Sequence, residues 1–274
     1  MKVRVDGQRR EGPAVDLRGV DVSGRAVLAA VRDPDDDRVA CPEPGPVHER
    51  VGHVHEEMGL SVRAAVAAAA RTRGATAPQD EAIEEARAAR DAVDVPAVDL
   101  EAARERVAEA GAAEDELRER VARLSGQLEA RREVGASTED VEAALAEATR
   151  RLSEAETERI AARQALRRAR EAARDARDAR ERRLELGDRV ANLRRAARTH
   201  LAAACWDQFR EALAAVPGDA DAGPDPGDVD GSTVTAALAV VRLADLSAPV
   251  VLACERFPSA EAARDCLAAP VIRV

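Results

Sequence analysis

The most regular pattern of apolar positions runs through the middle of the chain. From Ile83 onward, apolar residues recur in alternating steps of three and four, the spacing found in the seam of a coiled coil. The first series ends near Gly135, a residue type that often ends helices, and a second series begins at Val141. The spacing predicts two long helices joined by a turn near residues 135–137. Pro96 should kink or split the first helix.

The two predicted helices carry opposite charges. Residues 80–119 contain fourteen acidic and five basic residues, whereas residues 159–198 contain fourteen arginines and six acidic residues. Helices joined by a short turn are antiparallel neighbours, which brings the two stretches side by side and places Glu114 near Arg159 in the seam. Because opposite charges set orientation in coiled coils, we expect a long antiparallel coiled-coil hairpin with a Glu114–Arg159 pair.

Shorter elements are expected before the hairpin. Residues 1–60 are predicted to form a β-rich unit, in which residues 25–32 and 38–41 are strands joined by the turn-forming stretch 33–37. A proline-rich segment follows, and its prolines exclude both a helix and a central strand.

The rest of the chain divides into three predicted parts. Residues 61–216 form a helical region that contains the hairpin, with Trp206 in a core at its base. Residues 217–232 form a linker rich in Asp, Gly and Pro, and residues 233–274 form a small α/β segment. The predicted fold class is therefore mainly α with a small α+β head and a hairpin stalk. The C-terminal segment is expected to pack with the N-terminal unit, and two separate heads are the alternative.

Composition and charge indicate the environment in which the protein works. No apolar run approaches the length of a membrane span and no signal peptide is evident, so we expect a cytoplasmic protein without membrane association. The net charge is −10, and Lys2 is the only lysine. This acidity suits the salty cytoplasm of a halophile, with a GC-rich mesophile as the alternative.

Several chemistries are excluded by the sequence. A phosphate-binding P-loop requires a Gly-Lys-Ser/Thr sequence and a pyridoxal phosphate enzyme requires a suitable lysine, and Lys2 supplies neither. The Gly-rich dinucleotide motif, the nucleophile elbow and the HExxH zinc motif are also missing from the sequence. The four cysteines show no spacing typical of a disulfide framework.

One cluster of residues is a candidate metal site. Cys41, His48, His53 and His55 fall within fifteen residues, and thiolate and imidazole groups are the usual ligands of zinc. The alternative, which we favour, is that the prolines only direct the chain toward the next helix and that the histidines are solvated or serve as caps. No other cofactor is expected.

Two charged segments have alternative interpretations. The arginine-rich second arm is a candidate nucleic-acid surface, but we favour neutralisation of the acidic arm because no aromatic residues are interspersed for base stacking. The aspartates of residues 217–232 are a weak Ca²⁺ candidate, because the segment departs from the EF-hand pattern, and we favour a solvated linker.

The N-terminal third carries a resemblance. The segments Cys41–His48 (CPEPGPVH), Gly59–Ala64 and Ala70–Gly74 resemble those of a family of uncharacterised proteins from halophilic archaea, which combine such an N-terminal unit with a charged helical middle. The resemblance implies no activity, but it favours a halophilic source.

These observations rank three functions. The first is a non-enzymatic interaction or scaffold protein, with a protein partner and with homo-oligomer formation as one option. The second is a metal-binding protein or enzyme that uses the Cys41 and His48 region. The third is an accessory factor associated with nucleic acid, which we consider the weakest.

Overall fold

A computed structural model describes residues 1–5 and 7–274, and Asp6 lies outside the described residues. The chain forms two compact units. Met1–Glu85 and Arg189–Val274 together make the α/β unit, and Ala86–Asp188 makes the hairpin unit. This division differs from the predicted boundaries, because the helical region expected over residues 61–216 contributes to both units. The fold is mainly α with α+β parts, as predicted.

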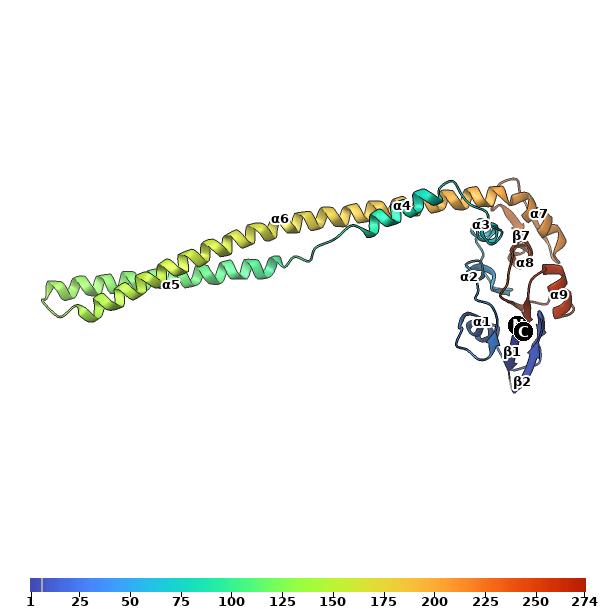
Figure 1. The fold of residues 1–274 in the computed structure, drawn as a ribbon, viewed down its shortest axis with the longest axis horizontal. Coiled ribbons are helices and arrows are strands. Elements are labelled where there is room, and N and C mark those ends of the chain that lie inside the picture. The colour runs from blue at the N-terminus through green and yellow to red at the C-terminus, as the bar shows by residue number, and fades with distance from the viewer. Residues whose placement is uncertain (6) are drawn as a thin grey trace. The chain divides into compact units, whose positions relative to one another are not determined.

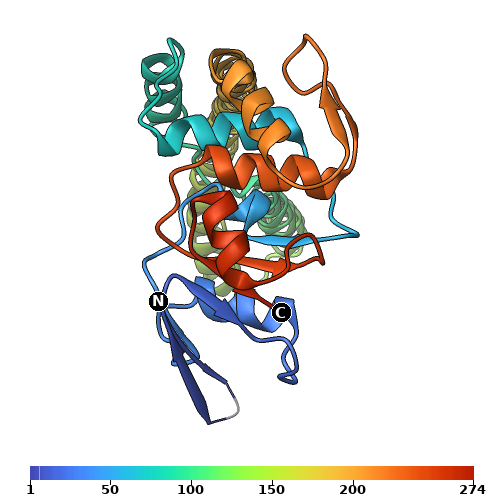
Figure 2. The ribbon, with the colours of Figure 1, turned by 90° about the vertical axis from the view of Figure 1, so that its right-hand side faces the viewer.

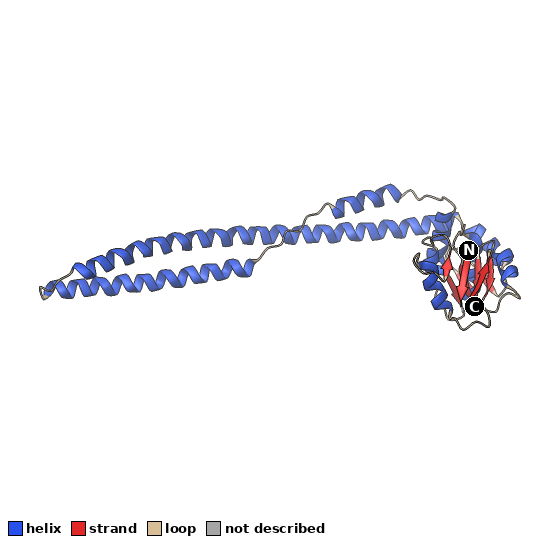
Figure 3. Ribbon diagram, turned by 60° about the horizontal axis from the view of Figure 1, so that its bottom comes forward, coloured by secondary structure: helices blue, strands red, loops and turns tan. Residues whose placement is uncertain are grey.

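The α/β unit is built around a parallel sheet of four strands (Figures 2 and 3). The strand order is β3-β9-β8-β5, and every neighbouring pair is parallel. The strands are Ala14–Asp16 (β3), His53–His55 (β5), Val250–Ala253 (β8) and Val271–Arg273 (β9). Two strands come from each end of the chain, so the N-terminal and C-terminal segments form one composite unit.

Helices cover both faces of this sheet. Along β8, Val250 and Leu252 belong to a larger core, whereas Val251 belongs to a smaller one, as expected when side chains alternate across a strand. The smaller core contains α1 (Gly24–Arg32). The larger core contains α3 (Val62–Thr72), α7 (Trp206–Ala215), α8 (Thr233–Leu243) and α9 (Ala260–Leu267).

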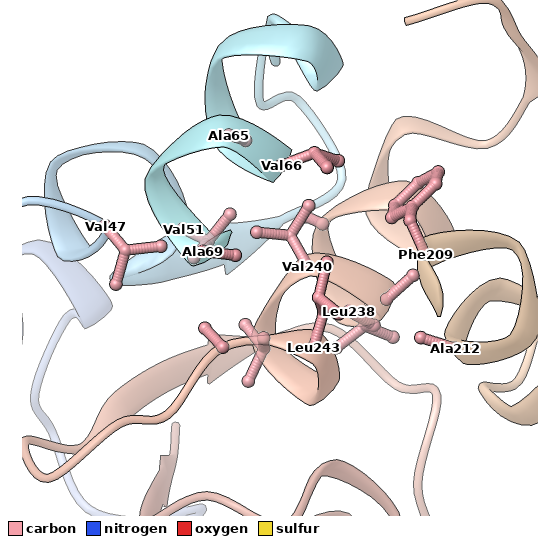
Figure 4. Packing of buried hydrophobic residues seen from close by; sticks show 14 of the residues in the cluster. Val47, Val51, Ala65, Val66, Ala69, Phe209, Ala212, Leu238, Val240 and Leu243 are labelled. Carbon is pink, nitrogen blue, oxygen red and sulfur yellow. The ribbon is translucent and has the colours of Figure 1, made fainter. Parts of the chain in front are cut away.

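The larger core consists mostly of small side chains (Figure 4). Leu238 and Val240 of α8 lie between residues of α3 and Phe209 of α7. Nine of the eleven residues of α8 are buried, so this helix is apolar on nearly all sides, as is typical of a central helix. Aromatic residues make up only 1% of the chain, so many small contacts must supply the burial that a few large rings supply elsewhere.

The N-terminal segment corrects one prediction. Residues 24–32 form the helix α1 and are not a strand. Ser23 accepts a hydrogen bond from the backbone N–H of Ala26 at 3.2 Å, which caps the helix, and Val27, Ala30 and Val31 lie at the spacing of one buried helical face. An antiparallel sheet packs nearby in the order β2-β1-β4; its strands are Lys2–Val5 (β1), Gln8–Glu11 (β2) and Val39–Ala40 (β4).

The predicted linker at residues 217–232 is also structured. It forms two paired strands, β6 (Ala220–Ala222) and β7 (Val229–Gly231). Their apolar residues pack against the larger core, and Trp206 donates its indole N–H to the carbonyl of Gly223 at 2.9 Å. The abundance of Asp, Gly and Pro here reflects tight turns, because these residues favour turns as well as disorder.

The hairpin unit consists of two antiparallel helices side by side (Figure 1). Helix α5 (Leu100–Glu133) runs toward the turn, and α6 (Glu139–Ala204) runs back from it, its residues up to Asp188 belonging to this unit. Residues 92–99, which include Pro96, are not helical and separate α5 from α4 (Asp80–Asp91), as predicted. In the part of the chain that the structure describes, no helix is long and apolar enough to cross a membrane.

Candidate functional site

Two of the candidate metal ligands are engaged by backbone carbonyls. The thiol of Cys41, after β4, lies 3.8 Å from the carbonyl oxygen of Val31, and burial raises its pKa. His48 begins the short helix α2 (His48–Val51), and its Nε2 donates to the carbonyl oxygen of Ala248 at 3.0 Å. Burial lowers the pKa of His48. Both side chains therefore have structural partners and are held in their neutral forms.

The other two candidates lie side by side on β5. The rings of His53 and His55 have centroids 4.7 Å apart, as expected for residues two apart on a strand. His53 also packs against Gly24 so closely that a Cβ atom at Gly24 would overlap its ring. The pKa of His53 is lowered mainly by burial and also by His55.

The structure does not assemble these four residues into a metal centre. Among residues 1–5 and 7–274, no group of three or more His, Cys, Asp or Glu side chains is arranged to hold a metal ion. Only the two histidines of β5 are brought together, whereas closed zinc sites use about four converging ligands. The geometry therefore does not support zinc binding at Cys41 and His48.

The carboxyl edge of the parallel sheet gathers polar residues that the sequence analysis did not identify. In open α/β sheets, ligands bind beyond the carboxyl ends of the strands. Here β3 ends at Asp16, β5 at His55, β8 just before Cys254 and β9 at Arg273. Burial raises the pKa of Cys254, which keeps its thiol protonated and unreactive.

Arg273 is the most unusual residue at this edge. The residue is only 4% exposed, and its Nη1 atom is buried without a hydrogen-bond partner. The nearby carboxylate of Asp16 is already bound by Arg18, whose Nη2 donates to Oδ2 at 2.8 Å and holds the pKa of Asp16 below its ordinary value. The charge of Arg273 also contributes to the lowered pKa of Asp16, so this carboxylate compensates it in part. Its Nη1 still lacks a hydrogen-bond acceptor, which a bound anion would supply.

A second arginine lies near the start of α8. Arg256 Nη2 lies 3.4 Å from the hydroxyl of Ser232, which caps α8, and 3.5 Å from a carboxylate oxygen of Glu56. Gly218, with a φ of +122°, approaches both Arg256 and the buried hydroxyl of Thr235, and no side chain would fit at that position. The sequence alone could not predict the residues at the carboxyl edge, because that requires knowing which strands lie side by side in the sheet.

The hairpin unit contains a buried charge at the position that the seam predicted. Glu114 is 5% exposed, and its Oε2 lies 3.0 Å from Nη1 of Arg159 on the facing helix. Arg118, one turn further along α5, also pairs with Glu114. Arg159 lowers the pKa of Glu114 most strongly, and Arg118 adds to this effect.

The turn of the hairpin is fixed by backbone geometry and by ion pairs. Gly135 has a φ of +64°, a conformation that favours glycine. Arg131 lies 2.5 Å from Asp140 and Arg132 lies 2.9 Å from Glu142, so α5 supplies the cations here and α6 the anions.

Few of the arginines of α6 form direct ion pairs with α5. In the described structure, Arg159 is the only arginine of residues 159–198 that forms an ion pair with α5. Trp206 has a structural role, since it stacks on Phe209 with ring centroids 4.9 Å apart inside the α/β core.

Comparison with known proteins gives a family without an assigned activity. Searches of the curated proteins and of the solved structures found no match. A family model described as a family of unknown function (DUF7856) matches residues 12–271, which span the composite sheet and the whole hairpin. The chain therefore belongs to the DUF7856 family.

Proposed function

We propose that this protein is a non-enzymatic interaction protein whose hairpin unit is the binding element. One observation carries the proposal. Among the described residues, the large apolar side chains that are exposed are Val134, Ile160 and Leu184, at 78%, 57% and 71% exposure, and all three belong to the hairpin unit. Single exposed apolar residues are common on protein surfaces, so the support for the proposal comes from their confinement to one unit.

The construction of the hairpin supports this proposal. Its seam follows the steps of a coiled coil, but many of the buried positions are alanine, including Ala110, Ala148, Ala155 and Ala176. Each alanine buries little apolar area, so the two helices gain little from contact with each other. A long element that adds little burial of its own is better explained by contacts with a partner.

In-cell photo-crosslinking tests this proposal. A crosslinking amino acid is placed at Ile160 or Leu184, with Asp35 of the α/β unit, which is also exposed, as the control position. We expect specific crosslinked products from the two hairpin positions and none from the control. Crosslinking confined to Asp35, or none at any position, would contradict the proposal.

We also propose that the protein works in the cytoplasm of a halophile. The net charge of −10 and the single lysine support this setting, because high salt screens repulsion among acidic groups. Thermal unfolding should then shift to higher temperature as KCl is raised into the molar range. Unchanged or lower stability in molar KCl would contradict this setting.

Arg273 favours a second candidate function, the binding of a small anion at the carboxyl edge of the parallel sheet. An anion at this edge would supply the hydrogen-bond acceptor that Arg273 Nη1 lacks. Inorganic phosphate should then raise the Tm of the wild-type protein but not that of Arg273→Met. If phosphate has no effect and Arg273→Met is the more stable protein, the arginine is simply an incompletely compensated buried charge.

A further inference from the structure

One face of α6 carries an uninterrupted row of arginines. Their sequence spacing is four, three, four and three residues, which at the helical repeat confines them to an arc of about 80° and a length of about 21 Å. All are exposed, and in the described structure none forms a hydrogen bond or an ion pair through its side chain. This Arg stripe consists of Arg163, Arg167, Arg170, Arg174 and Arg177.

One face of α5 carries a matching row of glutamates. The spacing is again four, three, four and three residues, with an alanine at the middle position. These glutamates are exposed, and within the described residues their side chains have no ion-pair partners. This Glu stripe consists of Glu105, Glu109, Ala112, Glu116 and Glu119.

The two stripes correspond position by position. Moving 58 residues along the chain converts each member of the Glu stripe into a member of the Arg stripe. The correspondence continues beyond one end of the stripes, where Arg123 of α5 maps onto Glu181 of α6 and the signs of both positions are reversed. In this register, four of the five arginines of the Arg stripe face a glutamate, the fifth, Arg170, faces Ala112, and the reversed pair Arg123 and Glu181 is again opposite in sign.

The stripes are unfavourable for the helices that carry them. Like charges four residues apart destabilise a helix by several tenths of a kcal/mol per pair. Such pairs occur at Arg163 and Arg167 and at Arg170 and Arg174, and again at Glu105 and Glu109. The arrangement is therefore better explained by what it binds than by the stability of its own helix.

The stripes cannot pair within one chain. Helices α5 and α6 are antiparallel, as the contacts Glu114–Arg159 and Arg131–Asp140 show, so residue numbers rise along one helix as they fall along the other. The 58-residue correspondence requires both numbers to rise together, which means parallel helices, and the contact Glu114–Arg159 holds the hairpin in a different, antiparallel register. An α5 helix running parallel to α6 must come from a second molecule.

We propose that the Arg stripe of one molecule docks on the Glu stripe of a second copy of this chain, with the two helices parallel and offset by 58 residues. This inference rests on the proposed function and names the partner of the hairpin unit. Ile160 and Leu184 flank the two ends of the Arg stripe, where the second copy would shield them. Nucleic acid would pair with the Arg stripe but would leave the Glu stripe without a role.

Charge reversal on each stripe tests the proposal. One full-length variant carries R163E, R167E and R174E, and the other carries E105R, E109R and E116R. Each exposed pair contributes about 0.2–1 kcal/mol, so the loss of three pairs should make either variant alone self-associate about threefold to a hundredfold more weakly than the wild type. Mixing the two should restore association, because each variant keeps one native stripe that complements the other's. Sedimentation velocity at low salt measures both effects.

A control variant reverses three arginines of the same helix that lie outside the stripe. R168E, R180E and R183E make the same change in charge and should leave self-association unchanged. Far-UV circular dichroism checks that all variants remain helical, and the glutamine variants E105Q, E109Q and E116Q should weaken association with less disturbance of the helix. Association of the wild type should weaken as salt is raised but persist in molar KCl, the proposed setting of the protein, because the burial of Ile160 and Leu184 does not depend on charge.

The possible outcomes separate the inference from the proposed function. A monomeric wild type at every concentration and salt, or a mixture that stays monomeric, overturns the second copy as partner. If the wild type stays monomeric and instead shifts duplex DNA in a gel, and R163E/R167E/R174E abolishes the shift, the Arg stripe binds nucleic acid. If Ile160 still crosslinks to another protein in cells while the wild type is monomeric, the inference fails and the proposed function stands.

Discussion

The charge of Glu114 is costly unless its cationic partners remain in place. Its carboxylate is buried and paired with Arg159 across the hairpin, so Arg159→Leu should lower the thermal stability of the hairpin unit. Replacing both residues with leucine should restore stability, because an apolar pair of similar volume avoids the desolvation of two charges. Helicity followed during thermal unfolding measures both variants. A stabilising Arg159→Leu would show that the two residues do not interact.

The same pair makes the hairpin sensitive to acid. The folded state lowers the pKa of Glu114, so the stabilisation is present above the ordinary pKa of a glutamate and is lost as the pH falls through the lowered value. Wild-type protein should therefore lose hairpin stability on acidification more steeply than the double leucine variant, which lacks this carboxylate.

His48 should make the stability of the α/β unit depend on pH, in a range above the one in which Glu114 affects the hairpin. Burial lowers the pKa of His48, so the unfolded chain binds a proton at about pH 6.5 while the folded chain does not. Its contribution to stability is therefore complete above about pH 6.5 and declines as the pH falls below that value. His48→Gln, whose amide can still donate to Ala248, should flatten this dependence. Urea unfolding at pH 5 and pH 7 gives the change in the free energy of unfolding between the two pH values. The same change in the wild type and in His48→Gln would contradict this prediction.

The turn between the long helices is an element whose geometry requires glycine. Gly135 has a φ of +64°, and a Cβ atom there would meet no neighbour, so only backbone strain opposes a side chain. Gly135→Ala should destabilise the hairpin by about 1 kcal/mol, and Gly135→Asn by less, because asparagine tolerates this conformation. Denaturant unfolding followed by circular dichroism measures the change.

Gly126 provides the matched control for this prediction. It lies within α5, where a Cβ atom also meets no neighbour. Gly126→Ala should therefore stabilise the hairpin by about 0.5–1 kcal/mol, since alanine is the better helix former. Destabilisation at both positions to the same extent would show that the turn has no special need for glycine.

The elements that the sequence predicted best are those whose signal is local and long. The steps of three and four residues predicted both hairpin helices, and Pro96 predicted the break before α5. Helix α1 was missed because its valines favour strands as well as one face of a helix. The strands at residues 220–231 were missed because their aspartates and glycines are equally typical of linkers.

The site residues follow the same division between local and distant signals. Glu114 and Arg159 could be placed opposite each other because both interrupt one periodic seam. The burial of Arg273 could not be predicted, because it depends on a parallel sheet whose short strands come from both ends of the chain. Cys41 and His48 are close in sequence, but tertiary contacts give each its own carbonyl partner.

At the scale of the whole molecule, the two units have separate interiors. The α/β unit has two apolar cores, whereas the hairpin unit buries mainly alanines along one seam. Burial of apolar area is the main source of stability, so the hairpin unit should be the weaker of the two. A single two-state transition is then not expected for this chain.

Two spectroscopic signals can follow the units separately. Trp206 is the only tryptophan and lies in the core of the α/β unit, so its fluorescence reports that unit alone. Helix α5 and residues 139–188 of α6 supply about half of the helical residues, so about half of the far-UV circular dichroism reports the hairpin. During urea unfolding, we expect this half of the circular dichroism signal to be lost first. The remainder should be lost together with the change in fluorescence at a higher urea concentration. Gly135→Ala should move only the first transition, because its strain lies in the hairpin turn. Superimposed transitions that move together in this variant would show that the two units unfold as one cooperative structure.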